Sequence, residues 1–155
     1  MLAKIVEPLI EWYEENHRIL PWRASKNPYY IWISEIMLQQ TRVEAVRPFF
    51  ERFIKVLPKV EDVAVCPEEQ LLKLWEGLGY YNRVRNIQKA AVRIVEEYGG
   101  RLPADYEKLK ELPGIGNYTA GAVASIAYDL PVPAVDGNVL RVYARIMEDD
   151  SDILK

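Results

Sequence analysis

The amino-acid sequence predicts an all-α fold, built from short helices within a single domain. Apolar residues recur at helical spacing along almost the whole chain, and no pair of segments shows the alternation expected of neighbouring strands. Proline, glycine and aspartate separate the helical segments, and there is no long linker, repeat or low-complexity tract. With 155 residues, 50% of them hydrophobic, the chain is long enough for one cored domain and too short for two.

The first expected helix covers residues 2–17, where Ile5, Leu9 and Tyr13 belong to an apolar stripe. The second covers residues 29–40, and prolines bracket the connection between the two. Seven further helices are expected at 42–57, 61–65, 68–75, 83–98, 105–110, 117–128 and 137–146. Residues 147–155, MEDDSDILK, are expected to form an acidic tail without a clear helix.

Composition excludes several classes of protein. The single cysteine, Cys66, permits no internal disulfide and argues against a zinc or iron–sulfur site in this chain, which fits an intracellular protein of the cytoplasm or nucleoid. The apolar runs are too short for a bilayer span, and the N-terminus carries acids unlike a signal peptide, so no membrane partner is expected. The net charge of −3 gives no general support for nucleic-acid binding.

Basic residues nevertheless gather locally at Arg83, Arg85, Lys89 and Arg93. Two interpretations stay open for this cluster: a solvated helix face, or a set of salt-dependent contacts with nucleic acid.

Two glycines one residue apart precede a predicted helix in LPGIGNYTAG, residues 112–121. Gly114 and Gly116 leave the first amides of that helix available to a phosphate, although a tight turn explains the same glycines. The spacing matches neither the dinucleotide-binding nor the Walker pattern.

Two acidic residues are candidates for chemistry. Glu35 lies in the apolar run IWISEIMLQQ, where burial would raise its pKa, unless its carboxylate reaches solvent at the helix margin. Asp136 precedes Gly137 and Asn138, and a helix N-cap explains it as well as a catalytic role does. Two carboxyl groups in unlike environments are the pair that glycosidic bond cleavage uses.

Taken together, these segments resemble the helix-hairpin-helix (HhH-GPD) DNA glycosylase superfamily, through LPGIGNYTAG and the following VDGN. SEIMLQQTRV and GLGYYNRVRN look like the MutY-type adenine DNA glycosylases within it, and the resemblance runs from about Leu20 to Arg145. It implies a six-helix barrel over 20–146, with the hairpin at 112–121. It also implies a DNA repair enzyme that hydrolyses the N-glycosidic bond of adenine opposite 8-oxoguanine or guanine in double-stranded DNA.

The resemblance also implies roles for individual residues. Glu35 would protonate adenine at N7, and Asp136 would stabilise the positive sugar, while Asn138 and Tyr118 orient the carboxylates and water. The implied substrate contacts come from Trp22, Arg23 and Leu38 in the base pocket, Gln40 inserted into the duplex, and Tyr80 stacked beside the opposite base. The implied DNA contacts come from Pro113, Gly114, Ile115 and Gly116 in the hairpin, with Arg83 and Arg85. Purely structural roles stay open for two of these features. Tyr80 could pack in the core, and LPWR could form a capped loop with a buried tryptophan.

Tyr118 stands where relatives that also cut the strand carry a lysine nucleophile. A phenol is a poor nucleophile at neutral pH, so a monofunctional glycosylase is expected. Thymine- or uracil-mismatch glycosylases of the same superfamily, which can carry tyrosine there, are the nearest alternative.

The sequence also departs from the family. Relatives continue with helices that pack on the first helix, within residues 1–19, and usually with a four-cysteine [4Fe-4S] loop, so this chain is expected to lack most of the cluster-bearing second domain and to hold no cofactor or metal. The helix at 2–17 is then expected to expose its apolar face. A monomer with weak or partner-dependent activity is expected. A non-catalytic helix-hairpin-helix module that binds DNA and a helical protein-interaction domain stay open as other classes.

Overall fold

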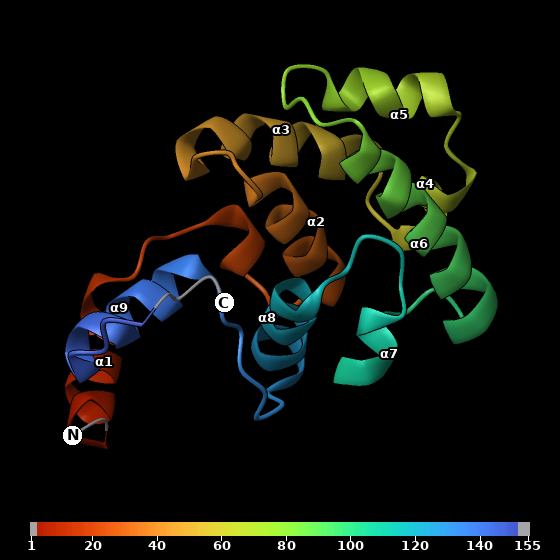
Figure 1. Cartoon of the computed structure of the whole chain (residues 1–155). Coiled ribbons are helices and arrows are strands. Elements are labelled where there is room, and N and C mark those ends of the chain that lie inside the picture. The colour runs from red at the N-terminus through yellow and green to blue at the C-terminus, as the bar shows by residue number, and fades with distance from the viewer. Residues whose placement is uncertain (1–2, 152–155) are drawn as a thin grey trace.

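The computed structural model describes residues 3–151, and every regular element in that range is a helix, which confirms the all-α class (Figure 1). The elements are α1 (Ala3–Asn16), the 3₁₀ helix η1 (Pro21–Arg23), α2 (Pro28–Leu38), α3 (Val43–Val56), α4 (Val60–Val65), α5 (Glu68–Trp75), α6 (Asn82–Tyr98), α7 (Tyr106–Lys110), α8 (Asn117–Tyr128) and α9 (Gly137–Met147). Residue 2 of the first expected helix and residues 152–155 of the expected tail lie outside the described residues.

The ends of the predicted helices differ from the observed ones by at most two residues within the described range. The largest difference is at α2, which ends at Leu38 because Gln39 leaves the helical region (ψ 117°) and Gln40 adopts a left-handed backbone (φ 58°). The short η1 was not predicted, since three residues carry no helical period.

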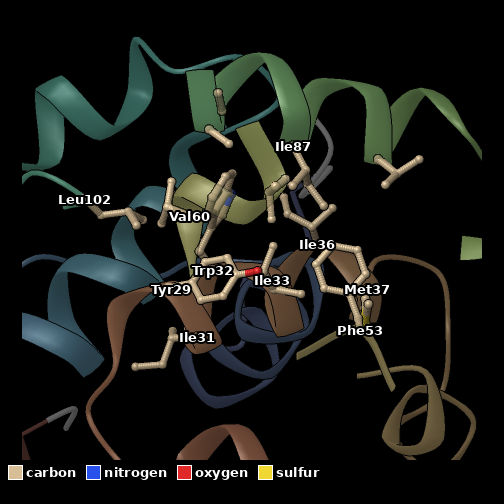
Figure 2. Close-up of a cluster of buried hydrophobic side chains, with 14 of the residues drawn as sticks. Tyr29, Ile31, Trp32, Ile33, Ile36, Met37, Phe53, Val60, Ile87 and Leu102 are labelled. Atoms are coloured by element: carbon tan, nitrogen blue, oxygen red, sulfur yellow. The ribbon is translucent and has the colours of Figure 1, made fainter. Parts of the chain in front are cut away.

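Helix α2 forms the centre of the core. Its N-terminus is fixed by Asn27, whose side chain accepts a hydrogen bond from the Tyr29 amide at 2.9 Å, with Pro28 at the first helical position. It packs against α3, α8 and η1, so apolar residues surround it on every side. Figure 2 shows this packing around Trp32, Ile33 and neighbouring side chains.

Helices α7 and α8 form the predicted hairpin. Leu112 and Ile115 are buried and anchor the loop between the helices. Gly114 has φ +76°, and a Cβ on it would lie 2.8 Å from Cβ of Asn86 in α6, so this position requires glycine. Gly116 has an ordinary φ of −89°, so the turn needs positive φ at only one of the two glycines.

An extended segment, residues 131–135, runs from α8 to Asp136 at the start of α9 (Figure 1). Gly121 of α8 allows this segment to approach closely, because a Cβ there would lie 2.1 Å from the carbonyl oxygen of Pro133. The close approach fixes where Asp136 emerges relative to α8.

Helices α1 and α9 contain no buried residue. The exposed apolar side chains of α1 include Val6, Leu9, Ile10 and Trp12, each more than half exposed, which confirms the expectation for this helix. No helix within residues 3–151 combines the length and the apolar character that crossing a membrane requires.

Candidate active site

One cavity of about 450 Å³ is lined by residues from four separate stretches of the chain. It is lined by Arg18, Leu20, Trp22, Arg23, Glu35, Leu38, Gln39, Gln40, Val43, Tyr118, Asp136 and Asn138. Every predicted catalytic and substrate-binding residue except Tyr80 therefore lies on it.

Glu35 is the most deeply buried of these groups, with 4% of its surface exposed. It lies on α2, the helix at the centre of the core. Burial raises the pKa of Glu35, while a hydrogen bond from Tyr118 and the charge of Arg23 lower it in part. The carboxyl group is therefore held toward its protonated form, as the sequence pattern predicts for a buried acid.

Asp136 has the opposite environment. Its Oδ1 accepts a hydrogen bond from the Val139 amide at 2.8 Å, and its Oδ2 accepts one from Nδ2 of Asn138 at 3.1 Å. These bonds, led by the one from Val139, lower the pKa of Asp136 and keep it ionised. Asp136 thus caps α9, as the simpler interpretation of the sequence predicts, and also faces the cavity.

Tyr118 lies on the first turn of α8, beside both carboxyl groups. Burial, with the nearby charge of Glu35, raises its pKa to about 12. The phenol therefore stays protonated at neutral pH and acts as a hydrogen-bond donor toward Glu35.

A second cavity of about 690 Å³ adjoins the first and shares Gln39 and Gln40 with it. Tyr80, Tyr81 and Arg85 line its other side. Tyr80 is 66% exposed, so core packing does not explain it. Gln40 and Tyr80 both have left-handed backbones, with φ of 58° and 48°, which are strained conformations for residues other than glycine.

The two predicted arginine contacts differ in their surroundings. Arg85 is exposed and pairs with Glu68 at 2.8 Å. Arg83 instead turns inward, and its guanidinium donates to backbone carbonyl groups, including that of Gln39 at 2.7 Å. Arg83 is half-buried, and we therefore assign its guanidinium to bonds within the protein rather than to a phosphate, a difference that its residue type could not indicate.

The sequence predicts a phosphate site at the N-terminus of α8. No side chain caps this helix at Gly116, and the first intrahelical bond from the loop side is donated by the Ala120 amide. Residues Gly116, Asn117 and Tyr118 are exposed, so the amides of the first turn face solvent. This arrangement can hold an anion without any basic side chain.

Four residues that line the first cavity were not predicted: Arg18, Leu20, Gln39 and Val43. Leu20 and Gln39 lie next to predicted residues in the sequence, and this proximity could have identified them as cavity residues. Arg18 lies in a connection without helical period, where no sequence signal marks it.

Metal ligands do not gather in the structure. No group of three or more histidine, cysteine or acidic residues is placed to hold a metal ion within the described range. A [4Fe-4S] cluster needs four cysteine thiolates, and the sequence has one cysteine, Cys66, which is buried. The residues of this chain do not fit such a cluster.

Comparison with known proteins gives a consistent result. Residues 33–153 match the family model described as HhH-GPD superfamily base excision DNA repair protein. The chain is 44% identical over 153 residues to the adenine DNA glycosylase of Mus musculus, covering 93% of this chain and 30% of that protein.

Solved structures match as well. A thermostable thymine-DNA glycosylase superimposes with a TM-score of 0.85 at 30% identity, covering 90% of this chain and 65% of that one. A non-covalent endonuclease III–DNA complex gives 0.82 at 29% identity, covering 99% and 73%. The chain thus spans less than a third of the mouse relative. The family model, in contrast, matches most of the length of this chain. The chain belongs to the HhH-GPD superfamily of base excision DNA repair proteins.

Proposed function

We propose that this chain is the catalytic region of an adenine DNA glycosylase, which hydrolyses the N-glycosidic bond of adenine paired with 8-oxoguanine or guanine. The observation that carries this proposal is the pair of carboxyl groups on one cavity, with the pKa of Glu35 raised and that of Asp136 lowered. A neutral acid beside an anion is the arrangement that glycosidic cleavage requires. The similarity to the mouse adenine DNA glycosylase supports the choice of base.

In the first step, Glu35 protonates adenine at N7. Protonation makes the departing base a neutral leaving group, and general acid catalysis of this kind contributes about 10²- to 10⁴-fold. Burial supports this role because it raises the pKa of Glu35 and so favours the protonated form that donates to the base.

In the second step, the bond to the sugar breaks and Asp136 stabilises the positive charge that develops there. The bonds from Val139 and Asn138 hold this carboxylate in place before the reaction, so little reorganisation is needed. Water then forms the new bond to the sugar carbon C1′, and the proton it loses returns to the Glu35 carboxylate, which restores the acid for the next cycle.

Tyr118 limits the chemistry to base removal. A phenol whose pKa is raised to about 12 does not act as a nucleophile at neutral pH. The proposed enzyme is therefore monofunctional and leaves an abasic site in an uncut strand.

The DNA duplex would be held through neutral and charged groups together. The amides at the start of α8 and the loop around Pro113 would bind a phosphate, and Arg85 would add an ionic contact. Gln40 would enter the duplex where the adenine leaves, and Tyr80 would lie by the opposite base. The exposure and the strained backbones of these two side chains support these roles.

A base-release assay tests the proposal. Duplexes with A opposite 8-oxoguanine, A opposite G and T opposite G are incubated with the protein, and abasic sites are exposed with alkali. We expect release from the two adenine duplexes and no strand cleavage before alkali. Cleavage without alkali would contradict the monofunctional assignment.

A second candidate is a thymine-mismatch glycosylase. The superposition on a thermostable thymine-DNA glycosylase, with a TM-score of 0.85, favours it specifically. Release from the T opposite G duplex alone would establish this candidate, and binding to all three duplexes with no release would indicate a non-catalytic module.

A further inference from the structure

Arg83, in the first turn of α6, is bonded to two loops that are far apart in the sequence. Its Nη1 donates to the carbonyl groups of Ile36, Met37 and Gln39 at 2.8, 3.4 and 2.7 Å. Its Nη2 donates to those of Leu78 and Gly79 at 3.1 and 3.3 Å. One guanidinium therefore joins the end of α2 to the loop that follows α5.

Two aromatic rings also pack against the Arg83 guanidinium. The Arg83 guanidinium carbon lies 5.4 Å from the ring centre of Trp75 and 5.5 Å from that of Tyr80. The Trp75 indole also donates to the Gly79 carbonyl at 3.1 Å, so this oxygen accepts from two side chains. The guanidinium has one preferred position as a result.

Each of the two joined loops contains a strained residue. Gln40 follows the carbonyl of Gln39, and Tyr80 follows that of Gly79, and both have positive φ. Such conformations are unfavourable for residues other than glycine and persist only where the surroundings enforce them. Arg83 supplies this enforcement, because its bonds end on the residue immediately before each strained one.

The geometry also relates these loops to the two cavities. Gln39 and Gln40 line both the cavity with the carboxyl groups and the larger one beside Tyr80. Of these two cavities, Arg83 lines the larger one and not the one with the carboxyl groups, and its hydrogen bonds end on neither Glu35 nor Asp136.

We propose that Arg83 is a positioning residue, which holds Gln40 and Tyr80 in the fixed relative orientation that extrusion of the target nucleotide requires. The inference rests on the proposed function. The forked guanidinium is needed because two separate nitrogens must reach two separate loops. Extrusion of a nucleotide requires free energy to unstack its base. Side chains of Gln40 and Tyr80 that are already in position lower the barrier to extrusion.

The test compares Arg83→Met, Arg83→Lys and Lys55→Met. Lys55 is an exposed residue of α3, outside the basic cluster, and its substitution removes the same charge without touching either loop. Adenine release is measured at saturating enzyme from a duplex with A opposite 8-oxoguanine, and from one with A opposite an abasic analogue, where extrusion is easier. Amide hydrogen exchange is followed at Thr41 and Leu78, which donate to Leu38 and Trp75.

We expect Arg83→Met to slow release from the paired duplex by about 10- to 100-fold, with a smaller loss opposite the abasic analogue. Arg83→Lys should recover part of the loss, and Lys55→Met should match the wild type. Both amides should exchange faster in Arg83→Met. An equal loss on the two duplexes, or wild-type release by Arg83→Met, would overturn the proposal.

The two proposals fail in different ways. If the wild-type protein releases no base from any duplex, the proposed function fails, and the exchange measurement then decides on Arg83. Faster exchange at both Thr41 and Leu78 in Arg83→Met supports the bridge between the loops. Unchanged exchange at either amide overturns it.

Discussion

At the scale of single residues, burial of Glu35 lowers the stability of the folded protein at neutral pH. Its pKa is raised in the folded state by burial, so the unfolded chain ionises at lower pH than the folded one. The free energy of unfolding therefore falls as pH rises from the ordinary glutamate pKa, about 4.3, to the raised value, and stays lower above it.

Replacing this residue should stabilise the protein at neutral pH. We expect Glu35→Gln to raise the Tm at pH 7, by about 3 to 5 °C for each tenfold change in the acid dissociation constant that burial causes, and to have little effect near pH 4. Calorimetry at both pH values measures this, with Glu96→Gln, an exposed glutamate of α6, as the control. A lower Tm for Glu35→Gln at pH 7 would contradict the account.

Asp136 has a structural role and a proposed chemical one, and two substitutions separate them. Asn keeps an oxygen for the Val139 amide but removes the charge, whereas Ala removes both. We expect Asp136→Asn to keep its Tm and lose base release by at least 100-fold. Asp136→Ala should lose activity and also about 1 kcal/mol of stability. Substantial release by Asp136→Asn would show that the charge is not needed.

The sequence predicted which residues face the first cavity better than it predicted what basic residues bind. Glu35 and Asp136 were found because an acid in an apolar run and an acid before a helix are local patterns. The sequence predicted a DNA contact for Arg83 because this residue lies in a basic segment. Its five carbonyl partners come from residues 36–39 and 78–79, which become neighbours only on folding, so the sequence could not indicate them.

At the scale of elements, Gly121 couples helix packing to the site. A Cβ at this position would overlap the Pro133 carbonyl, so Gly121→Ala should push residues 131–135 away from α8 and displace Asp136. We expect base release to fall by about 100-fold and stability by about 1 to 3 kcal/mol. Kinetics and thermal unfolding measure the two effects.

Gly137→Ala is the matched control for stability, since a Cβ there meets nothing within 4 Å. Its free energy of unfolding should stay within about 0.5 kcal/mol of the wild type. Unimpaired base release by Gly121→Ala would refute the coupling between α8 and Asp136.

The helices were predictable because each has apolar residues at helical spacing and is bounded by proline, glycine or aspartate. The exception is the end of α2, where Gln39 and Gln40 are good helix formers and the sequence extends the helix through them. In the structure, Arg83 binds the carbonyl groups at this helix end and the chain turns away. Tertiary contacts override local preference here, at a proposed contact with DNA.

At the scale of the whole molecule, an acidic protein is proposed to bind DNA. The net charge is −3, and the hairpin amides carry no net charge, so few phosphates would be neutralised by cations. Each such contact contributes about −0.9 to the slope of log K against log salt concentration. We expect a slope between about −2 and −4, measured by fluorescence anisotropy, and a slope steeper than about −6 would contradict a grip made mainly by amides.

The central claim is that Glu35 and Asp136 together remove adenine from DNA. The most direct test is the quantity of free adenine that the wild-type protein and Glu35→Gln release from a duplex with A opposite 8-oxoguanine, with binding measured in the same samples. The account predicts release by the wild type, and a loss of at least about 100-fold in the variant at unchanged affinity. Undiminished release by Glu35→Gln, or binding without release by the wild type, would contradict it.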